Sequence, residues 1–448
     1  MDSTPLFTRR DVLRTGAGIG VGTTGVAGCL GTELSDETGS TDTTTGTTET
    51  DTSIFEPPQD VCRTDSSVGG SGPLFRSVDS RGTYRCVGRP LDSMENLDRW
   101  QADTGRLDAD GETAFSGTQS ARIEAEPSDE RAVVHRSFPG GVDLSERDLS
   151  LAVHPGAEHP ADNVIVQLFA PDARNRIDHW QHLGPADSWK RLDLGPTKVV
   201  GDPDLGDVRR LAVVSYTGGG SRVRFYVDEI RTTTKLDQGY VLLTFDDSLT
   251  SQYETAFPLT EEFGFPGNVG VIPWKAGSDP YLGQSELAEM REAGWDVVSH
   301  PQREEPLPDL SAEKQRAAIE EAKGWLVDRG FERGARFAIW PYGATNETTL
   351  DVGSDYHALG FAGGVHPSGC PFMGPLSVSR VNGDDVERTR KVVDFALEYN
   401  QVAVVVYHPI GVGATHVSEA AFEETLQSLA DRRANVVTAS HLWDEVVP

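Results

Sequence analysis

The stretch that decides the fold is Val241-Leu242-Leu243-Thr244-Phe245-Asp246-Asp247. Its apolar, β-branched and aromatic residues are typical of a strand that is buried on both faces. The strand leads directly into two carboxylates, which are costly to bury unless a metal ion, a hydrogen-bond network or a catalytic role stabilises them. In α/β folds, catalytic groups lie at the carboxyl ends of parallel strands. The alternative is a strand end followed by an Asp-Asp-Ser turn or a helix N-cap.

The composition points to an acidic protein of several domains. A length of 448 residues predicts two or three domains, and the formal net charge is −30. That charge argues against nucleic acid or an anionic membrane as an electrostatic partner. Because most basic residues are arginines, the acidic, lysine-poor surface resembles that of halophilic proteins; an ordinary acidic secreted protein is the alternative. Four cysteines without a Cys-x-x-Cys pair predict neither a disulfide scaffold nor a cysteine zinc site.

The first 29 residues resemble an export signal. Arg9-Arg10 precedes a short, Gly-rich apolar run that ends in Val26-Ala27-Gly28-Cys29. The twin arginines resemble a twin-arginine signal, and the ending resembles a lipoprotein processing box. We therefore expect residues 1–29 to be a signal that is cut before Cys29, so that Cys29 becomes the new N-terminus and carries lipid. The lipid would anchor the exported protein to the outer face of the cell membrane. The alternative for Cys29 is an ordinary buried thiol.

A linker follows the signal. Residues 30–60 are acidic and rich in Thr, with almost no apolar content, and they predict a disordered tether. Cys62 and Cys86 come next, in an irregular stretch. In an exported protein they would be able to form a disulfide, and two free thiols are the alternative.

Residues 91–234 predict an all-β domain. Short alternating runs separated by Gly, Asp and Pro are typical of a β-sandwich or jelly roll. The runs are 120–125, 149–153, 164–169, 210–215 and 223–227. The opening 96–100 and the closing 225–230 resemble the first and last strands of carbohydrate-binding jelly rolls. Trp180 and Trp189 are candidates to stack on sugar rings, although a core position is the commoner fate of such residues.

Residues 238–448 alternate strands with helices. The predicted helices are 284–293, 311–329, 386–399 and 418–433, with Ser311 and Ser418 as N-caps. The predicted strands between them are 268–272, 296–299, 337–340, 402–407 and 434–438. This alternation predicts a parallel sheet, either open or closed into a barrel.

Functional side chains follow the predicted strands of this region. Asp246 and Asp247 end the first strand, and Ser299-His300, Trp340-Pro341-Tyr342-Gly343 and Tyr407-His408 end three others. A single histidine is more often structural than a ligand. Because a barrel collects such strand ends on one rim, their joint occurrence predicts a site there.

These motifs resemble the polysaccharide deacetylase family, that is, the NodB homology domain or carbohydrate esterase family 4. Thr244-Phe245-Asp246-Asp247, Ser299-His300, Trp340-Pro341-Tyr342-Gly343 and Tyr407-His408 are similar to its first, second, third and last motifs. The resemblance covers residues 238–448 and implies a distorted (β/α) barrel of NodB type behind the β-sandwich. It also implies that Trp340, Pro341 and Tyr342 contact the substrate.

The resemblance implies a mechanism. Asp247 and His300 would bind a divalent metal, zinc in most of the family, which polarises an acetamide carbonyl and its bound water. Asp246 would be the general base. The backbone N–H of Tyr342 would stabilise the oxyanion, and His408 would protonate the leaving amine.

The sequence departs from the family pattern at three positions, one of which is Val405, where leucine is usual in the last motif. Glu304 stands where the family has a second metal-binding His, and a carboxylate is an acceptable zinc ligand. Ile339 stands where an Arg pairs with the base, and Arg380 on a predicted strand 376–381 is a candidate replacement, with a surface Arg as the alternative. Asp384 and Asp385 would orient His408 or form a turn.

Two functions follow from the sequence. The first is a metal-dependent hydrolase that removes N-acetyl groups from a surface or extracellular polysaccharide. The second is an inactive relative that binds glycan as a surface lipoprotein. The loss of the second His and of the usual Arg adds weight to the second, but the first is the function we expect. Other hydrolytic chemistry on the same barrel, such as O-deacetylation, is the remaining alternative.

Overall fold

The computed structural model describes residues 54–56, 87–184, 188–218 and 221–447. The predicted export signal with Cys29, most of the 30–60 linker, and both Cys62 and Cys86 lie outside these ranges. No helix in the described ranges has the length and apolar character needed to cross a membrane.

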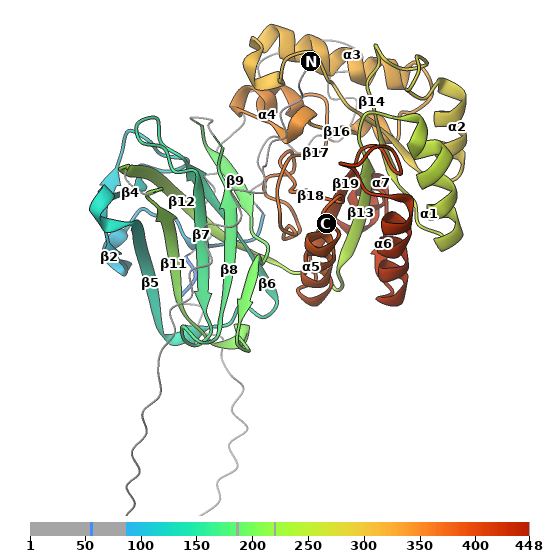
Figure 1. The fold of residues 1–448 in the computed structure, drawn as a ribbon. Coiled ribbons are helices and arrows are strands. Elements are labelled where there is room, and N and C mark those ends of the chain that lie inside the picture. The colour runs from blue at the N-terminus through green and yellow to red at the C-terminus, as the bar shows by residue number, and fades with distance from the viewer. Residues whose placement is uncertain (1–53, 57–86, 185–187, 219–220, 448) are drawn as a thin grey trace, which may run out of the picture. The chain divides into compact units, whose positions relative to one another are not determined.

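The first half of the described chain forms two antiparallel sheets (Figure 1). One has the order β3-β4-β12-β6-β9 with β1 beside β12, and the other has the order β10-β8-β7-β11-β5-β2. The first sheet contains β1 (Arg89–Asp92), β3 (Arg106–Asp110), β4 (Ser120–Ala125), β6 (Arg147–His154), β9 (Lys190–Asp193) and β12 (Val223–Thr234). The second contains β2 (Trp100–Thr104), β5 (Arg131–Val142), β7 (Asn163–Phe169), β8 (Arg176–His182), β10 (Lys198–Val200) and β11 (Val208–Tyr216).

The two sheets share one hydrophobic core, as a sandwich requires. Ile123 faces Phe225 across β4 and β12, Val134 faces Val213 across β5 and β11, and all four residues belong to the same buried cluster. Alternation along each strand sends these side chains inward. The predicted opening strand 96–100 is corrected: Asn96 caps a short 3₁₀ turn, and β2 begins only at Trp100.

Neither tryptophan proposed for sugar stacking is well exposed. Trp189 is 7% exposed and packs edge-on against Phe115, with ring centroids 5.5 Å apart. Trp180 is half-buried and lies parallel to the ring of His182. For Trp189 the core alternative therefore holds.

The second half contains a parallel sheet with the order β17-β16-β15-β14-β13-β19-β18 and with β20 beside β13. Its strands are β13 (Tyr240–Phe245), β14 (Asn268–Val271), β15 (Asp296–Ser299), β16 (Phe337–Ile339), β17 (Leu359–Phe361), β18 (Val381–Asn382), β19 (Val402–Tyr407) and β20 (Asn435–Val436). The run that opened the sequence analysis is β13, an interior strand whose Val241, Leu242, Leu243 and Phe245 are completely buried.

One short segment joins the two edges of this sheet. Val378 bridges to Phe361 of β17, and Val381 of β18 pairs with Val405 of β19. The predicted strand 376–381 is thus reduced to β18 and one bridge. Residues 378–382, called the closing segment below, therefore link the two edges of the sheet, through one bridge on one side and through β18 on the other.

The helices lie around the parallel strands in Figure 1. They are α1 (Phe257–Phe263), α2 (Gln284–Glu292), α3 (Ala312–Val327), α4 (Glu347–Ser354), α5 (Val386–Glu398), α6 (Glu419–Asp431) and α7 (Ala439–His441). Ser311 and Ser418 cap α3 and α6 as predicted, each accepting a hydrogen bond from a backbone N–H three residues later.

Buried carboxylates connect the sandwich to the α/β part. Asp193 accepts hydrogen bonds from the backbone N–H groups of Met373 (3.0 Å) and Gly374 (2.9 Å). Asp148 accepts from Gln401 Nε2 (2.7 Å) and from the backbone N–H of Cys370 (3.3 Å). Burial raises the pKa of Asp148 to about 7, against the lowering effect of the Gln401 hydrogen bond.

This pKa predicts how the contact responds to pH. The folded state binds the Asp148 proton more tightly than the unfolded state does. Protonation of Asp148 therefore makes its full contribution to the free energy of unfolding at acid pH. This contribution is lost as the pH rises from about 4 to about 7. We expect the free energy of unfolding of the wild type, relative to that of Asp148→Asn, to fall over this range. Urea unfolding at fixed salt measures the difference. Asp237→Asn, at an exposed carboxylate, is the control, and wild-type and Asp148→Asn curves that stay parallel would contradict the assignment.

Candidate active site

The predicted functional side chains meet at the carboxyl ends of the parallel strands. Asp246 and Asp247 follow β13, His300 follows β15, and His408 follows β19. Asp246 donates its backbone N–H to the carbonyl of Tyr407 (2.8 Å), which fixes the end of β13 against that of β19. The register of the sheet therefore brings together groups that are more than 150 residues apart in the chain.

Asp246 is held in a buried ion pair with Arg380. The two Arg380 Nη atoms lie 2.7 Å and 3.2 Å from the two carboxylate oxygens, and both side chains are about 95% buried. Arg380 also donates to the carbonyl of Ala362 and to the hydroxyl of Thr244. The arginine comes from the closing segment 378–382, and Ile339, which stands at the position expected for the pairing arginine, is completely buried.

Asp247 and His300 form the second pair. His300 Nδ1 lies 2.8 Å from the carbonyl of Ile339, which can only accept a hydrogen bond, so Nδ1 carries a proton. Its Nε2 lies 3.4 Å from Asp247 Oδ1. Without a proton or a cation between them, these two atoms would repel each other as lone-pair acceptors. Asp247 has a left-handed backbone (φ 74°), which L-residues rarely adopt and which is common at functional sites.

The charges around this pair oppose the effect of burial. Burial lowers the pKa of His300, but the hydrogen bond that His300 donates to Asp247 and the charges of Asp246 and Asp247 outweigh it, and the pKa is raised. Burial raises the pKa of Asp247, but His300, His408 and Lys275 outweigh it, and the pKa is lowered. Both shifts favour the charged pair, or an equivalent cation in place of the proton.

The same pair matches part of a divalent metal site. Two donors that are each about 2.1 Å from a tetrahedral ion lie roughly 3.4 Å apart, which is the separation of Asp247 Oδ1 and His300 Nε2. The hydrogen bond from Nδ1 to Ile339 is the outer contact that orients metal-binding histidines. Asp247 and His300 thus fit two positions of such an ion.

The third predicted ligand is corrected. Glu304 is exposed on the loop after β15, and within the described ranges no three His, Cys, Asp or Glu side chains gather closely enough to hold a metal. The acid-rich loop turns away after Pro301, where the neighbouring Arg303 pairs with Glu321 of α3. Remaining positions on an ion would fall to water or substrate.

His408 lies on the open side of the site. Its Nε2 is 3.8 Å from Asp246 Oδ2, and its side chain is 40% exposed. The predicted orienting role of Asp384 is corrected, because Asp384 contacts His416 Nδ1 at 3.4 Å and accepts the backbone N–H of Val417. Asp385 caps α5 instead of reaching the site. His416, whose ring is 6.3 Å from that of His408, was not predicted, since no motif in its Gly-rich loop distinguishes it.

Of the residues Trp340, Pro341 and Tyr342, the first two are buried and only Tyr342 is exposed at the site. Trp340 is completely buried, and its indole N–H donates to the carbonyl of Leu376 (2.7 Å). Pro341 is buried as well. Their predicted substrate contacts are therefore corrected. Tyr342 is 51% exposed with φ 60°.

Two further side chains near the site were missed. Gln252 donates from one amide nitrogen to the carbonyls of Asp246 and His408, and thereby fastens the ends of β13 and β19 together. Trp274, after β14, is 55% exposed. An exposed tryptophan cannot be distinguished from a buried one by its neighbours in the sequence, and this one lies outside the motifs.

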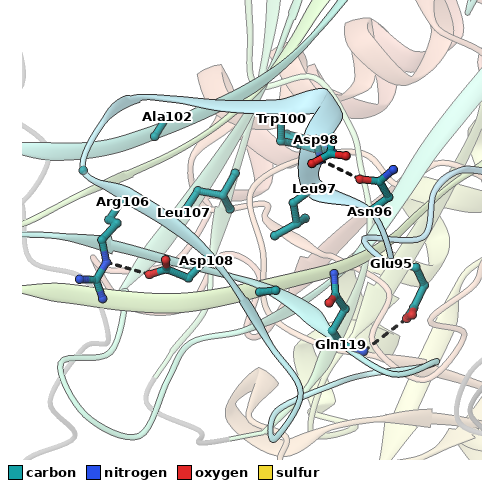
Figure 2. A pocket seen from close by; sticks show the side chains of 12 residues that line it. Glu95, Asn96, Leu97, Asp98, Trp100, Ala102, Arg106, Leu107, Asp108 and Gln119 are labelled. Carbon is teal, nitrogen blue, oxygen red and sulfur yellow. Dashed lines mark hydrogen bonds and ion pairs between the residues drawn. The ribbon is translucent and has the colours of Figure 1, made fainter.

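A separate hollow of about 680 Å³ lies in the sandwich, at the β2–β3 hairpin (Figure 2). It is lined by Glu95, Asn96, Leu97, Asp98, Trp100, Ala102, Gly105, Arg106, Leu107, Asp108, Ala109 and Gln119. Several of its polar groups are already engaged: Asn96 caps the adjoining turn, and Arg106 pairs with Asp108 at 2.7 Å. The paired Asp, His and Arg side chains of the strand ends are not part of it.

Comparisons with known proteins point to one family. The family model for polysaccharide deacetylase matches residues 233–359. The Bacillus subtilis (strain 168) protein YxkH, which is named as a polysaccharide deacetylase, is 29% identical over 110 residues, covering 25% of this chain and 39% of that protein. The chain thus spans well under half of that relative's length.

Solved structures give weaker likenesses. The Streptococcus pyogenes deacetylase PplD in complex with acetate is 24% identical over 34% of this chain and 69% of its own, with a TM-score of 0.31. A family 4 carbohydrate esterase from Streptomyces lividans in complex with acetate is 19% identical over 45% of this chain and 92% of its own, with a TM-score of 0.33. With its four strand-end motifs and the family match, the C-terminal half of this chain contains a NodB homology domain of the polysaccharide deacetylase family.

Proposed function

We propose that the protein is a metal-dependent hydrolase that removes N-acetyl groups from a polysaccharide. The observation that carries this proposal is the buried Asp246 carboxylate, which Arg380 grips through both oxygens and which has His408 on its open side at 3.8 Å. A paired acid and histidine at the rim of a parallel sheet suit proton transfer during amide hydrolysis.

Asp246 is the general base in this proposal. The guanidinium of Arg380 offsets the cost of burying the negative charge and fixes the plane of the carboxylate. Asp246 accepts a proton from the attacking water, while the water oxygen bonds to the acetyl carbon. Because both oxygens are already oriented, little reorganisation is needed as the proton moves.

Asp247 and His300 would hold the divalent ion, zinc by family resemblance. When bound, such an ion polarises the acyl carbonyl and lowers the pKa of a coordinated water. With two protein ligands in place of the usual three, we expect weaker binding than at a complete catalytic zinc site.

Two groups act on the carbonyl and the leaving group. The backbone N–H of Tyr342, whose residue is exposed at the carboxyl end of β16, donates to the developing oxyanion. His408 gives a proton to the amide nitrogen as the carbon–nitrogen bond breaks, which releases acetate and leaves a free amino sugar. The exposure of His408 suits contact with a polymer that stays in solvent.

We further propose that the chain acts outside the cell. The twin arginines support export, and Cys29 supports a lipid anchor on the outer face of the cell membrane. An N-acetylated polysaccharide is accessible there. The acidic composition suits a surface protein in high salt.

Removing the base tests the mechanism. Asp246→Asn keeps the shape of the side chain but cannot accept the proton, so we expect acetate release from an N-acetylglucosamine oligosaccharide to fall about 10³-fold. Enzymatic acetate measurement gives the rate, and unfolding curves show that the variant is folded. Asp237→Asn, before the amino end of β13, is the matched control and should keep the wild-type rate. An Asp246→Asn rate within tenfold of the wild type would mean that another group is the base.

Metal binding tests the ligand assignment. Asp247→Ala removes one of two donors and should lower zinc affinity at least about tenfold in calorimetric titration. Glu304→Ala should leave the affinity unchanged, because Glu304 is exposed on the neighbouring loop. If Glu304→Ala weakens zinc binding as much as Asp247→Ala does, the loop must close onto the ion and the two-ligand description is wrong.

A further inference from the structure

Exposed apolar side chains gather at the same sheet edge as the candidate site. In the described ranges the large apolar residues that stand out are Trp274 (55% exposed), Val412 (55%), Tyr342 (51%) and Tyr216 (49%). The first three follow β14, β19 and β16 at their carboxyl ends, whereas Tyr216 ends β11 in the sandwich. Large apolar side chains that are exposed together beside polar groups mark binding surfaces.

The sheet order places Trp274 beside the reacting groups. β14 lies between β13, which carries Asp246 and Asp247, and β15, which carries His300. A Cβ atom added to Gly270 of β14 would lie 3.4 Å from the Cβ of His300. The loop after β14 therefore begins next to the site, and Trp274 is three residues beyond the strand.

The Trp274 ring is fixed in position. Its indole N–H donates to the backbone carbonyl of Gln302 (3.1 Å), and the backbone N–H of Gln302 donates to the carbonyl of His300 (2.7 Å). Lys275 Nζ donates to Gln302 Oε1 (3.2 Å) and lies 5.0 Å from the Trp274 ring centroid and 4.8 Å from that of Tyr281. These contacts fix the exposed ring of Trp274 in one orientation. Because the ring is already ordered, less conformational entropy is lost when a ligand binds to it.

We propose that Trp274 is a sugar-binding residue, whose exposed ring stacks on a pyranose next to the sugar that is deacetylated. This inference rests on the proposed function. The C–H face of a pyranose matches a flat aromatic surface, and hydroxyls at the ring edge find donors in Lys275 and Gln302.

The proposal has a consequence for the substrate. A single N-acetylated sugar placed at Asp246 and His408 leaves Trp274 uncovered, whereas a chain covers both. The protein should therefore prefer oligosaccharides, and the preference should depend on the Trp274 ring and not on aromatic exposure in general.

Calorimetric binding of a hexasaccharide of N-acetylglucosamine tests this inference. Trp274→Ala should weaken binding about tenfold, and Trp274→Phe, which keeps an aromatic face, should restore most of the affinity. Tyr216→Ala is the matched control, since it removes an equally exposed aromatic ring from the sandwich and should leave the affinity within twofold.

The result separates the two proposals, because binding is measured independently of acetate release. If the wild type binds the hexasaccharide but releases no acetate, the proposed function is wrong. The role of Trp274 is then still decided by the hexasaccharide affinities of the Trp274 variants. Equal hexasaccharide affinity in wild type and a folded Trp274→Ala variant overturns the inference, as does a wild type that does not bind the oligosaccharide.

Discussion

The buried ion pair between Asp246 and Arg380 is the interaction on which the candidate site depends. Both side chains are about 95% buried, and two hydrogen bonds join them. Breaking such a pair by removing one partner typically costs about 3–5 kcal/mol, because the other charge is left uncompensated. Electrostatics therefore contributes to the arrangement of β13, β18 and β19. The carboxylate of Asp246 after β13 is stable in the interior only when the guanidinium of Arg380, from the closing segment, lies beside it.

Local signals in the sequence were sufficient for much of the fold. The apolar run of β13 and the runs that became β15 and β19 are buried as predicted, and Ser311 and Ser418 cap α3 and α6. Short elements were missed, because β17 has three residues with a central glycine and α4 has eight. Such elements are stabilised by tertiary packing, which neighbouring residues do not reveal.

In the candidate site, too, residues at strand ends were predicted and residues whose position depends on a loop were not. Asp246, Asp247, His300 and His408 follow strands, so parallel register was enough to predict that they meet. Glu304 and Trp340 were assigned from motif positions and Asp384 from its place after Arg380, and each depends on how a loop or side chain turns after the strand ends. Loop direction is set by contacts such as Arg303 with Glu321 and Asp384 with Val417, between residues whose pairing no local pattern shows.

The segment 378–382 has a consequence for how the protein matures. It seals the ring of strands and also delivers the guanidinium that neutralises Asp246. A nascent chain that has emerged only as far as α4 already contains β13 through β16, but its acid has no counterion. The Asp246 charge is balanced only when synthesis has passed Arg380 and β19 has docked, so the candidate site should be among the last parts of the folding chain to form.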